Sequence, residues 1–140
     1  MAITTQQLIE LLNRDLALEY TAIVQYVQHS GVLTGAEYGD IIKEIKIHAT
    51  EELQHALILA DHIDYLGGIP TVEVPPAKAS QDNREMLQQD LEGEEDAIAR
   101  YKQRVVQAEE LKELALSQKL REILAMEQEH AMDLTNALGK

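Results

Sequence analysis

Two Glu-x-x-His pairs stand in the sequence, Glu52 with His55 in "EELQHALILA" and Glu127 with His130 in "MEQEHAMDL". Residues three apart on an α-helix share one face, with about 5 to 6 Å between their Cβ atoms. A carboxylate and an imidazole so placed can bind one divalent metal ion or bridge two neighbouring ions. Both pairs lie in stripes where leucine and alanine are the ordinary choice, so they are candidates for metal ligands.

Two further glutamates accompany these pairs at a fixed distance. Glu19 precedes Glu52 by 33 residues, and Glu94 precedes Glu127 by the same interval. Each half of the chain therefore offers one lone glutamate and one Glu-x-x-His pair at the same relative height.

The two halves of the chain are related by an internal repeat. A shift of 75 residues superposes "DLALEYTAIVQYVQ" (15–28) on "DLEGEEDAIARYKQ" (90–103), which agree at seven of fourteen positions, and it carries the first Glu-x-x-His pair onto the second. One helical hairpin is used twice. Packing of its copies about a pseudo-twofold axis would bring four carboxylates and two imidazoles together in mid-bundle.

Electrostatics favour metal ions at such a site. Four ionised carboxylates that are buried together repel one another and lose hydration, so without cations they must take up protons or water. Two divalent cations cancel the four charges. Carboxylates with neutral imidazoles suit iron or manganese, and zinc is a substitute although no thiolate favours it. A single glutamate in an apolar stripe, or one Glu-x-x-His pair, is more simply explained as a group at the edge of the buried face that reaches water. Six such residues related by one shift instead favour a dinuclear site.

Four helices must position these side chains. The first is expected to begin near Thr4, whose hydroxyl can cap it while Gln7 reaches back in a capping box. "SGVLTGAEYG" (30–39) then interrupts the helical pattern with three glycines. The later helices are expected at about 37–66, at about 81–109 with Ser80 as the N-cap, and from about Leu111 or Leu114 to Leu138, with Gly139 as a stop.

The connections between these helices predict the topology. The turns within each hairpin are short, whereas "GGIPTVEVPPAKAS" holds all three prolines and forms one long connection between the second and third helices. The sequence therefore predicts an all-α fold, an antiparallel four-helix bundle of ferritin-like connectivity with one long crossover, as a single domain over residues 1–140.

Composition limits the class of protein. The net charge of -13 repels phosphate backbones and attracts cations, so nucleic acid is not expected as a partner and metal ions are. The absence of cysteine excludes disulfides and thiolate zinc sites. No basic leader precedes an apolar run, and the longest aliphatic patch, "ALILA", is far short of a membrane span. A cytoplasmic protein without a membrane partner is expected.

On these residues the sequence resembles a bacterioferritin, within the ferritin-like di-iron carboxylate proteins, over essentially its whole length. The segments that carry the resemblance are "LALEYTAIVQY", "EELQHA", "DLEGEEDA" and "EQEHA". The resemblance implies that Glu52 and Glu127 bridge two iron ions. It implies terminal ligands from Glu19 with His55 and from Glu94 with His130.

Two tyrosines and an activity also follow from the resemblance. Tyr26 corresponds to the family's tyrosine beside the site, and Tyr101 is its mate in the repeat; packing in the core is the other interpretation of both. The implied activity is oxidation of Fe(II) by dioxygen or peroxide, with ferric mineral stored in a homo-oligomer, a hollow 24-subunit shell. The redox chemistry belongs to the metal.

The sequence departs from the family pattern at several positions. Leu53 stands where bacterioferritins have the haem-ligating methionine, so haem is not expected. An inner-surface iron site of some relatives uses a histidine at the position of Ile47 and an acid at Glu51, and only the acid is present. His48 is interpreted as a surface residue, while His29 and His62 receive no role. A short fifth helix is not expected after Lys140, so the sequence leaves undecided whether the subunits assemble into the full 24-subunit cage.

Two alternatives remain at this stage. A rubrerythrin-like di-iron enzyme would reduce peroxide as a small oligomer without mineral storage, although such proteins usually add a cysteine-rich module and an extra carboxylate. A purely structural bundle would keep the stripe carboxylates only as relics of a lost site.

Overall fold

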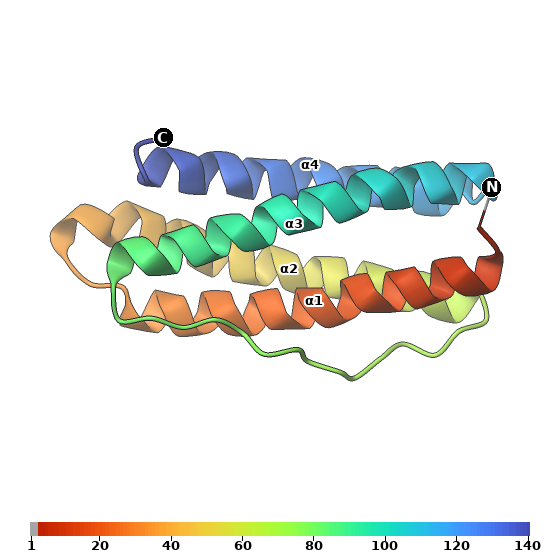
Figure 1. Cartoon of the computed structure of the whole chain (residues 1–140), viewed down its shortest axis with the longest axis horizontal. Coiled ribbons are helices and arrows are strands. Elements are labelled where there is room, and N and C mark those ends of the chain that lie inside the picture. The colour runs from red at the N-terminus through yellow and green to blue at the C-terminus, as the bar shows by residue number, and fades with distance from the viewer. Residues whose placement is uncertain (1–2) are drawn as a thin grey trace.

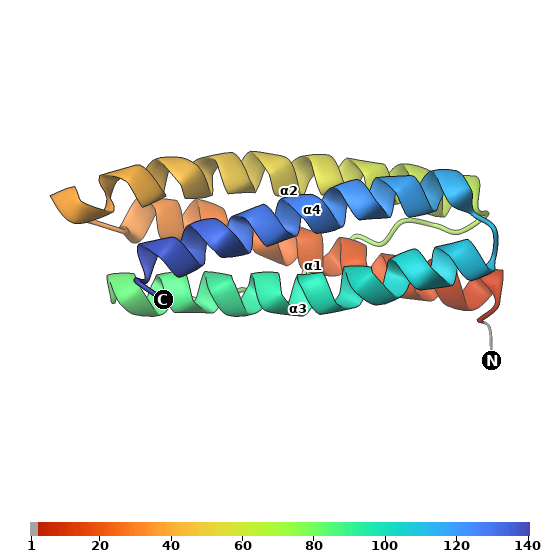
Figure 2. The same cartoon turned by 90° about the horizontal axis from the view of Figure 1, so that it is seen from above.

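Four long helices form an antiparallel bundle in the computed structural model (Figures 1 and 2). The structure describes residues 3–140, so Met1 and Ala2 of the predicted domain lie outside the described residues. The helices are α1 (Thr5–Val32), α2 (Gly39–Tyr65), α3 (Asn83–Glu110) and α4 (Leu114–Ala137), and a short 3-10 helix, η1 (Ala36–Tyr38), precedes α2. No strand occurs between residues 3 and 140. The predicted fold class and connectivity are confirmed.

The helix ends follow local capping chemistry. Thr4 accepts a hydrogen bond from the backbone N–H of Gln7 at 3.1 Å and the Gln7 side chain accepts one from the N–H of Thr4 at 2.9 Å, which confirms the capping box. The prediction of Ser80 as the N-cap of α3 is wrong. Asp82 is the cap, and its carboxylate accepts from the N–H of Glu85 at 2.8 Å.

One other boundary differs from the expectation, and the start of the fourth helix, left open between Leu111 and Leu114, is decided. Helix α2 begins at Gly39 because the preceding residues, 36–38, form η1 instead of a regular turn of α-helix. Helix α4 begins at Leu114 and not at Leu111, since Lys112 adopts a left-handed backbone with φ of 59° that ends the helical path. Each hairpin turn is therefore short and tightly defined.

The crossover between α2 and α3 runs extended along α1 (Figure 1). The Asn13 side chain binds both the carbonyl of Ile69 and the N–H of Thr71, at 3.0 and 2.9 Å. The hydroxyl of Thr21 donates to the carbonyl of Pro75 at 2.7 Å. These contacts satisfy backbone groups that no helix pairs, and they hold the segment against the bundle.

Two apolar clusters occupy the two halves of the bundle. Each draws buried side chains from all four helices; members include Leu12, Leu59, Val105 and Leu120 in one and Tyr26, Ile45, Leu87 and Leu134 in the other. Burial of each such aliphatic side chain contributes about 1.5–3 kcal/mol. Burial of the two clusters therefore offsets the free-energy cost of the polar layer that is buried between them.

None of the helices in the described part of the chain is both long and apolar enough to span a membrane.

Candidate metal centre

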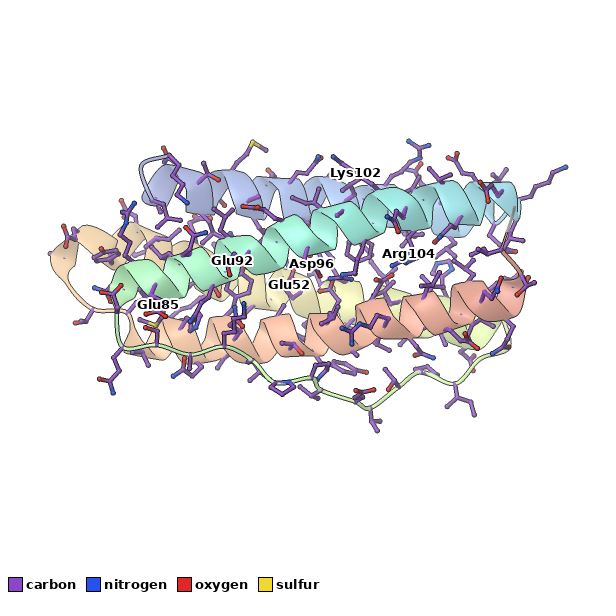
Figure 3. The ribbon with its side chains drawn as sticks, in the orientation of Figure 1. Glu52, Glu85, Glu92, Asp96, Lys102 and Arg104 are labelled. Carbon is purple, nitrogen blue, oxygen red and sulfur yellow. The ribbon has the colours of Figure 1, made fainter. Side chains whose placement is uncertain are left out.

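All six predicted ligands lie in the interior of the bundle. Glu19 comes from α1, Glu94 from α3, and one Glu-x-x-His pair from each of α2 and α4; every one of the six is at most 5% exposed. Figure 3 shows Glu52 near the middle of the bundle's length. The structure thus brings together the side chains that the 75-residue shift relates.

The six side chains form two overlapping groups of four. Glu19, Glu52, His55 and Glu127 offer ligand atoms that all lie within 4.8 Å of one another, and so do Glu52, Glu94, Glu127 and His130. Glu52 and Glu127 belong to both groups. The geometry therefore has two adjacent centres, each with one lone glutamate and one histidine, and two glutamates between them.

The histidines face the shared glutamates through their Nδ1 atoms. His55 Nδ1 lies 3.2 Å from Glu52 Oε1 and 3.5 Å from Glu127 Oε1. His130 Nδ1 lies 3.4 Å and 3.3 Å from the same two oxygens. Because both rings point the same nitrogen at the same pair of carboxylates, the pseudo-twofold relation extends to individual atoms.

Several of these buried atoms have no hydrogen-bond partner within residues 3–140. They are Glu19 Oε2, Glu52 Oε1, His55 Nδ1 and both carboxylate oxygens of Glu127. A buried polar atom without a partner costs about 1–3 kcal/mol, and more when it is charged. Convergent orphaned oxygens and a nitrogen fit the donor set of divalent iron, manganese or zinc, whose coordination would satisfy them together.

Two tyrosines hold the lone glutamates from the opposite hairpin. Tyr101 donates to Glu19 Oε1 at 2.6 Å, and Tyr26 donates to Glu94 Oε2 at 3.0 Å. Burial raises the pKa of both phenols well above the ordinary value, and the facing carboxylates raise it further. Both hydroxyls therefore remain protonated donors beside the site.

Burial shifts the proton affinities of the carboxylates. It raises the pKa of Glu19, Glu52 and Glu94, with repulsion from Glu127 as the next cause. Burial would also raise the pKa of Glu127, but the interactions with His130 and Glu52 lower it overall. Without metal, Glu19, Glu52 and Glu94 therefore lose their protons less readily than free glutamates do.

The histidine side of the cluster compensates the remaining negative charge. Although burial opposes its charged form, Glu127 and Glu94 raise the pKa of His130 to about 11. Burial likewise opposes charge on His55, and Glu19 raises its pKa overall. Metal binding would have to displace these protons.

An outer layer of buried polar groups repeats the same pseudo-symmetry, and the sequence analysis missed it. The carboxylate of Asp15 accepts from Arg104 Nε at 2.6 Å and from Arg100 at 2.6 Å. The mates of these residues under the 75-residue shift form the corresponding cluster: Asp90, His29 and Gln25, with Asp90 2.9 Å from His29 Nδ1 and accepting from Gln25 at 2.9 Å. The matched aspartates of the repeat were the signal that could have found it.

The interpretation of His48 as a surface residue is wrong. His48 is 1% exposed, and its ring stacks on that of His130 with centroids 3.9 Å apart. Burial, followed by the charge of His130, lowers the pKa of His48 to about 4. Its spacing of seven from Ile41 and three from Ile45 already places it in the buried stripe, which was the signal available in the sequence.

The other positions of interest lie around the centre. Glu51 Oε1 lies 2.9 Å from His130 Nε2, whereas Ile47 and Leu53 are about half exposed. His62 is partly buried and lines a groove with Tyr65 near the end of α2, away from the six ligands.

A small cavity lies against the site between α1 and α3. Its volume is about 90 Å³, and its lining includes all four glutamates together with the small residues Ala22, Gly93 and Ala97. Small side chains on the facing helices leave this space open. It is large enough for water or for a small diatomic molecule beside the carboxylates.

Comparisons with known proteins identify the family. The family model described as a ferritin-like domain matches residues 9–140. A bacterioferritin of Brucella melitensis is 34% identical over 125 residues, covering 89% of this chain and 78% of that protein.

Solved structures extend the similarity to the whole fold. A ferritin-like, di-iron carboxylate protein from Bacillus anthracis superposes with a TM-score of 0.93 at 36% identity and 99% coverage of both chains. A dodecameric thioferritin from Bacteroides fragilis, described as bacterioferritin-related, gives 0.90 at 30% identity, covering 98% of this chain and 87% of the other.

Proposed function

The chain belongs to the ferritin-like family, and on this premise we propose that it is a ferroxidase subunit that oxidises Fe(II) at an intrachain dinuclear site and stores the ferric product. The observation that carries the proposal is the pair of four-residue groups that share Glu52 and Glu127. Bacterioferritins are iron-storage ferroxidases, and this arrangement provides two adjacent positions for the substrate ions.

The proposed roles follow the geometry of the groups. Glu52 and Glu127 would bridge two iron ions, because their oxygens belong to both groups. Glu19 with His55, and Glu94 with His130, would be the terminal ligands. When bound, the two ions supply the electrons that reduce dioxygen or peroxide.

The protein's own residues orient the metal ligands and carry the protons that iron displaces. Tyr101 and Tyr26 fix the orientation of Glu19 and Glu94 through their hydroxyls. Protons leave the carboxylate cluster when iron binds, and Glu51 lies against His130 Nε2, where it can fix the orientation of that ring. The 90 Å³ cavity between α1 and α3 gives a place beside the carboxylates for the small oxidant.

Storage requires a shell of subunits. The resemblance implies 24 subunits, whereas the thioferritin relative is a dodecamer, so a closed shell of either size is consistent with the proposal. We further propose that residues 1–140 act as one domain, since both apolar clusters draw on all four helices.

Anaerobic Fe(II) titration combined with native mass measurement tests the proposal. We expect Fe(II) to bind with at least two ions per chain, rapid oxidation when oxidant is added, and a large oligomer that retains far more iron than its dinuclear sites hold. A dimer that holds no more than two irons per chain would instead support the rubrerythrin-like alternative.

Substitution of the shared glutamates tests the site. The double variant Glu52→Gln, Glu127→Gln keeps the size of both side chains and removes both bridging charges, so rapid Fe(II) oxidation should be lost. Glu92→Gln is the matched control, because that glutamate is exposed on α3 and its one ion-pair partner within residues 3–140 is Lys78, at 3.4 Å. Unchanged metal uptake with higher thermal stability in the double variant would favour the structural bundle.

A further inference from the structure

A third group of potential metal ligands lies outside the six residues of the dinuclear site. Glu44 and His48 of α2 and Asp133 of α4 offer ligand atoms that all lie within 4.8 Å of one another. His48 Nε2 is 3.1 Å from Asp133 Oδ2. Two ligand atoms that each lie about 2.1 Å from one metal ion are at most about 4.2 Å apart, and the exposed Glu44 side chain has room to close the difference.

His48 is a buried polar side chain whose ring packs against His130 and Tyr26 but has few hydrogen-bond partners. The residue is 1% exposed, and its only hydrogen-bonding contact in the described part of the chain is Asp133, while Nδ1 has no partner. An imidazole at such a place loses hydration that one hydrogen bond does not replace. An aliphatic residue would fill the position at lower cost.

The repeat shows that this polar group belongs to one half of the bundle only. Under the 75-residue shift His48 corresponds to Ile123 and Asp133 corresponds to Ile58. Ile123 is 1% exposed and packs in the apolar core. The dinuclear ligands and the Asp15 and Asp90 clusters keep their pseudo-symmetry, so the third group is a local departure from the duplicated plan.

A groove open to solvent is lined by two members of this group, Glu44 and Asp133. Its volume is about 400 Å³, and its lining includes Glu44 and Asp133 together with Glu37, Asp40 and Asn136. Four of these five side chains are acidic and Arg84 is the one basic residue in the lining, so the groove carries a negative charge and attracts cations. A cation in the groove meets Glu44 and Asp133, and His48 lies buried behind them with Nε2 3.1 Å from Asp133 Oδ2.

We propose that Glu44, His48 and Asp133 form a third site for a divalent metal ion, next to His130 and separate from the dinuclear pair. Two carboxylates and one imidazole suit first-row divalent ions such as Fe(II), Mn(II) and Zn(II). The site differs from the inner-surface site of some relatives, whose positions correspond to Ile47 and Glu51 here: Ile47 is half exposed, and Glu51 contacts His130 Nε2 at 2.9 Å.

Zinc titration of the full-length, metal-free protein tests the proposal, because Zn(II) takes no part in redox chemistry. Calorimetry should give three ions per wild-type chain and two in the variant Glu44→Gln, Asp133→Asn. Both side chains are partly or fully exposed, so this variant is expected to fold. The control variant Glu37→Gln, Asp40→Asn removes two acids from the same groove and should still bind three.

Two further variants separate this site from the dinuclear one. His48→Ile, which installs the residue found at the repeat position, should also bind two ions while circular dichroism shows an intact fold. Glu52→Gln, Glu127→Gln should retain one ion, and anomalous scattering should place it at His48. Equal numbers of bound zinc ions in the wild type and in the variant Glu44→Gln, Asp133→Asn overturn the proposal, whatever the dinuclear site binds. Loss of one zinc ion in that variant supports the proposal even if the dinuclear site binds no metal.

Discussion

Buried glutamates of the candidate centre bind protons more readily than free glutamates do. Folding raises the pKa of Glu19, Glu52 and Glu94, mainly by burial. The folded chain therefore binds more protons than the unfolded chain at pH values above the ordinary glutamate pKa. His130, with a pKa of about 11, adds to this excess of bound protons at pH values above the ordinary histidine pKa.

The stability of the metal-free protein should fall as the pH rises from 6 to 9. Unfolding free energy decreases with pH wherever the folded state binds more protons than the unfolded state. The contribution of His130 is fully present below about 6.5 and is lost as the pH rises toward 11, and the raised glutamates act in the same direction. Two groups with lowered pKa values act the opposite way: Glu127 near and below pH 4.5, and His48, with a pKa of about 4, between about pH 4 and 6.5.

Chemical denaturation of metal-free protein at several pH values measures this slope. With saturating Zn(II) the trend should weaken or reverse, because the ions displace the protons and their binding improves as the pH rises. A metal-free protein whose unfolding free energy increases from pH 6 to 9 would contradict the assignment of protons to the buried cluster.

At the scale of the helices, α1 and α3 are joined by charged layers on either side of the metal centre. Asp15 and Arg104 are 0% and 3% exposed, and their bidentate contact has its counterpart in Asp90 and His29. A buried ion pair adds little net stability, but removal of one partner leaves an uncompensated charge. These layers therefore fix the register of the two hairpins more than they strengthen the fold.

Arg104→Leu should lower the unfolding free energy by about 3 kcal/mol, the low end for a broken buried pair, because Arg100 still faces Asp15. Urea denaturation of the metal-free protein measures the loss. Arg121→Leu is the control, since that side chain is 55% exposed and its solvent-screened pair with Glu109 should contribute little to stability. Equal losses in the two variants would show that the Asp15 layer is not a buried pair in solution.

The sequence predicted the bundle and the convergence of the six ligands because both follow from periodicity. A stripe repeated every three to four residues defines the buried face, and the 75-residue shift sets equal heights for Glu19 and Glu94. Neither result requires knowledge of a long-range contact.

The features that were missed depend on contacts between distant segments. Ser80 and Asp82 are both good N-caps, and the start of α3 is set by tertiary contacts, such as the Asn83 side chain that donates to the Thr34 carbonyl at 2.8 Å. The burial of His48 could have been inferred from its place in the stripe with Ile41 and Ile45, but its partner Asp133 lies 85 residues away on α4. Side-chain chemistry alone does not reveal such pairs.

At the scale of the whole molecule, the net charge of -13 favours the approach of Fe(II). Attraction of this kind extends over a Debye length, which shrinks from about 30 Å at 0.01 M ionic strength to about 8 Å at 0.15 M. The initial rate of Fe(II) oxidation should therefore fall several-fold over this range, as steered association generally does.

Stopped-flow absorbance with limiting Fe(II) measures this dependence. A second salt with a weakly coordinating anion, at the same ionic strength, controls for binding of the anion to iron. A rate that does not change with either salt would show that encounter with the acidic surface does not limit the reaction.

The extended crossover along α1 also bears on how the two hairpins meet. Each hairpin alone carries half of the ligands, so two separate copies would have to associate from solution before a complete centre could form. The connecting segment between residues 66 and 82 converts that bimolecular encounter into an intramolecular one. For a flexible tether, the effective concentration of one hairpin relative to the other is in the millimolar range. Assembly of the centre within one subunit is thus independent of protein dilution, and the two halves have been free to diverge, as they have at His48 and Ile123.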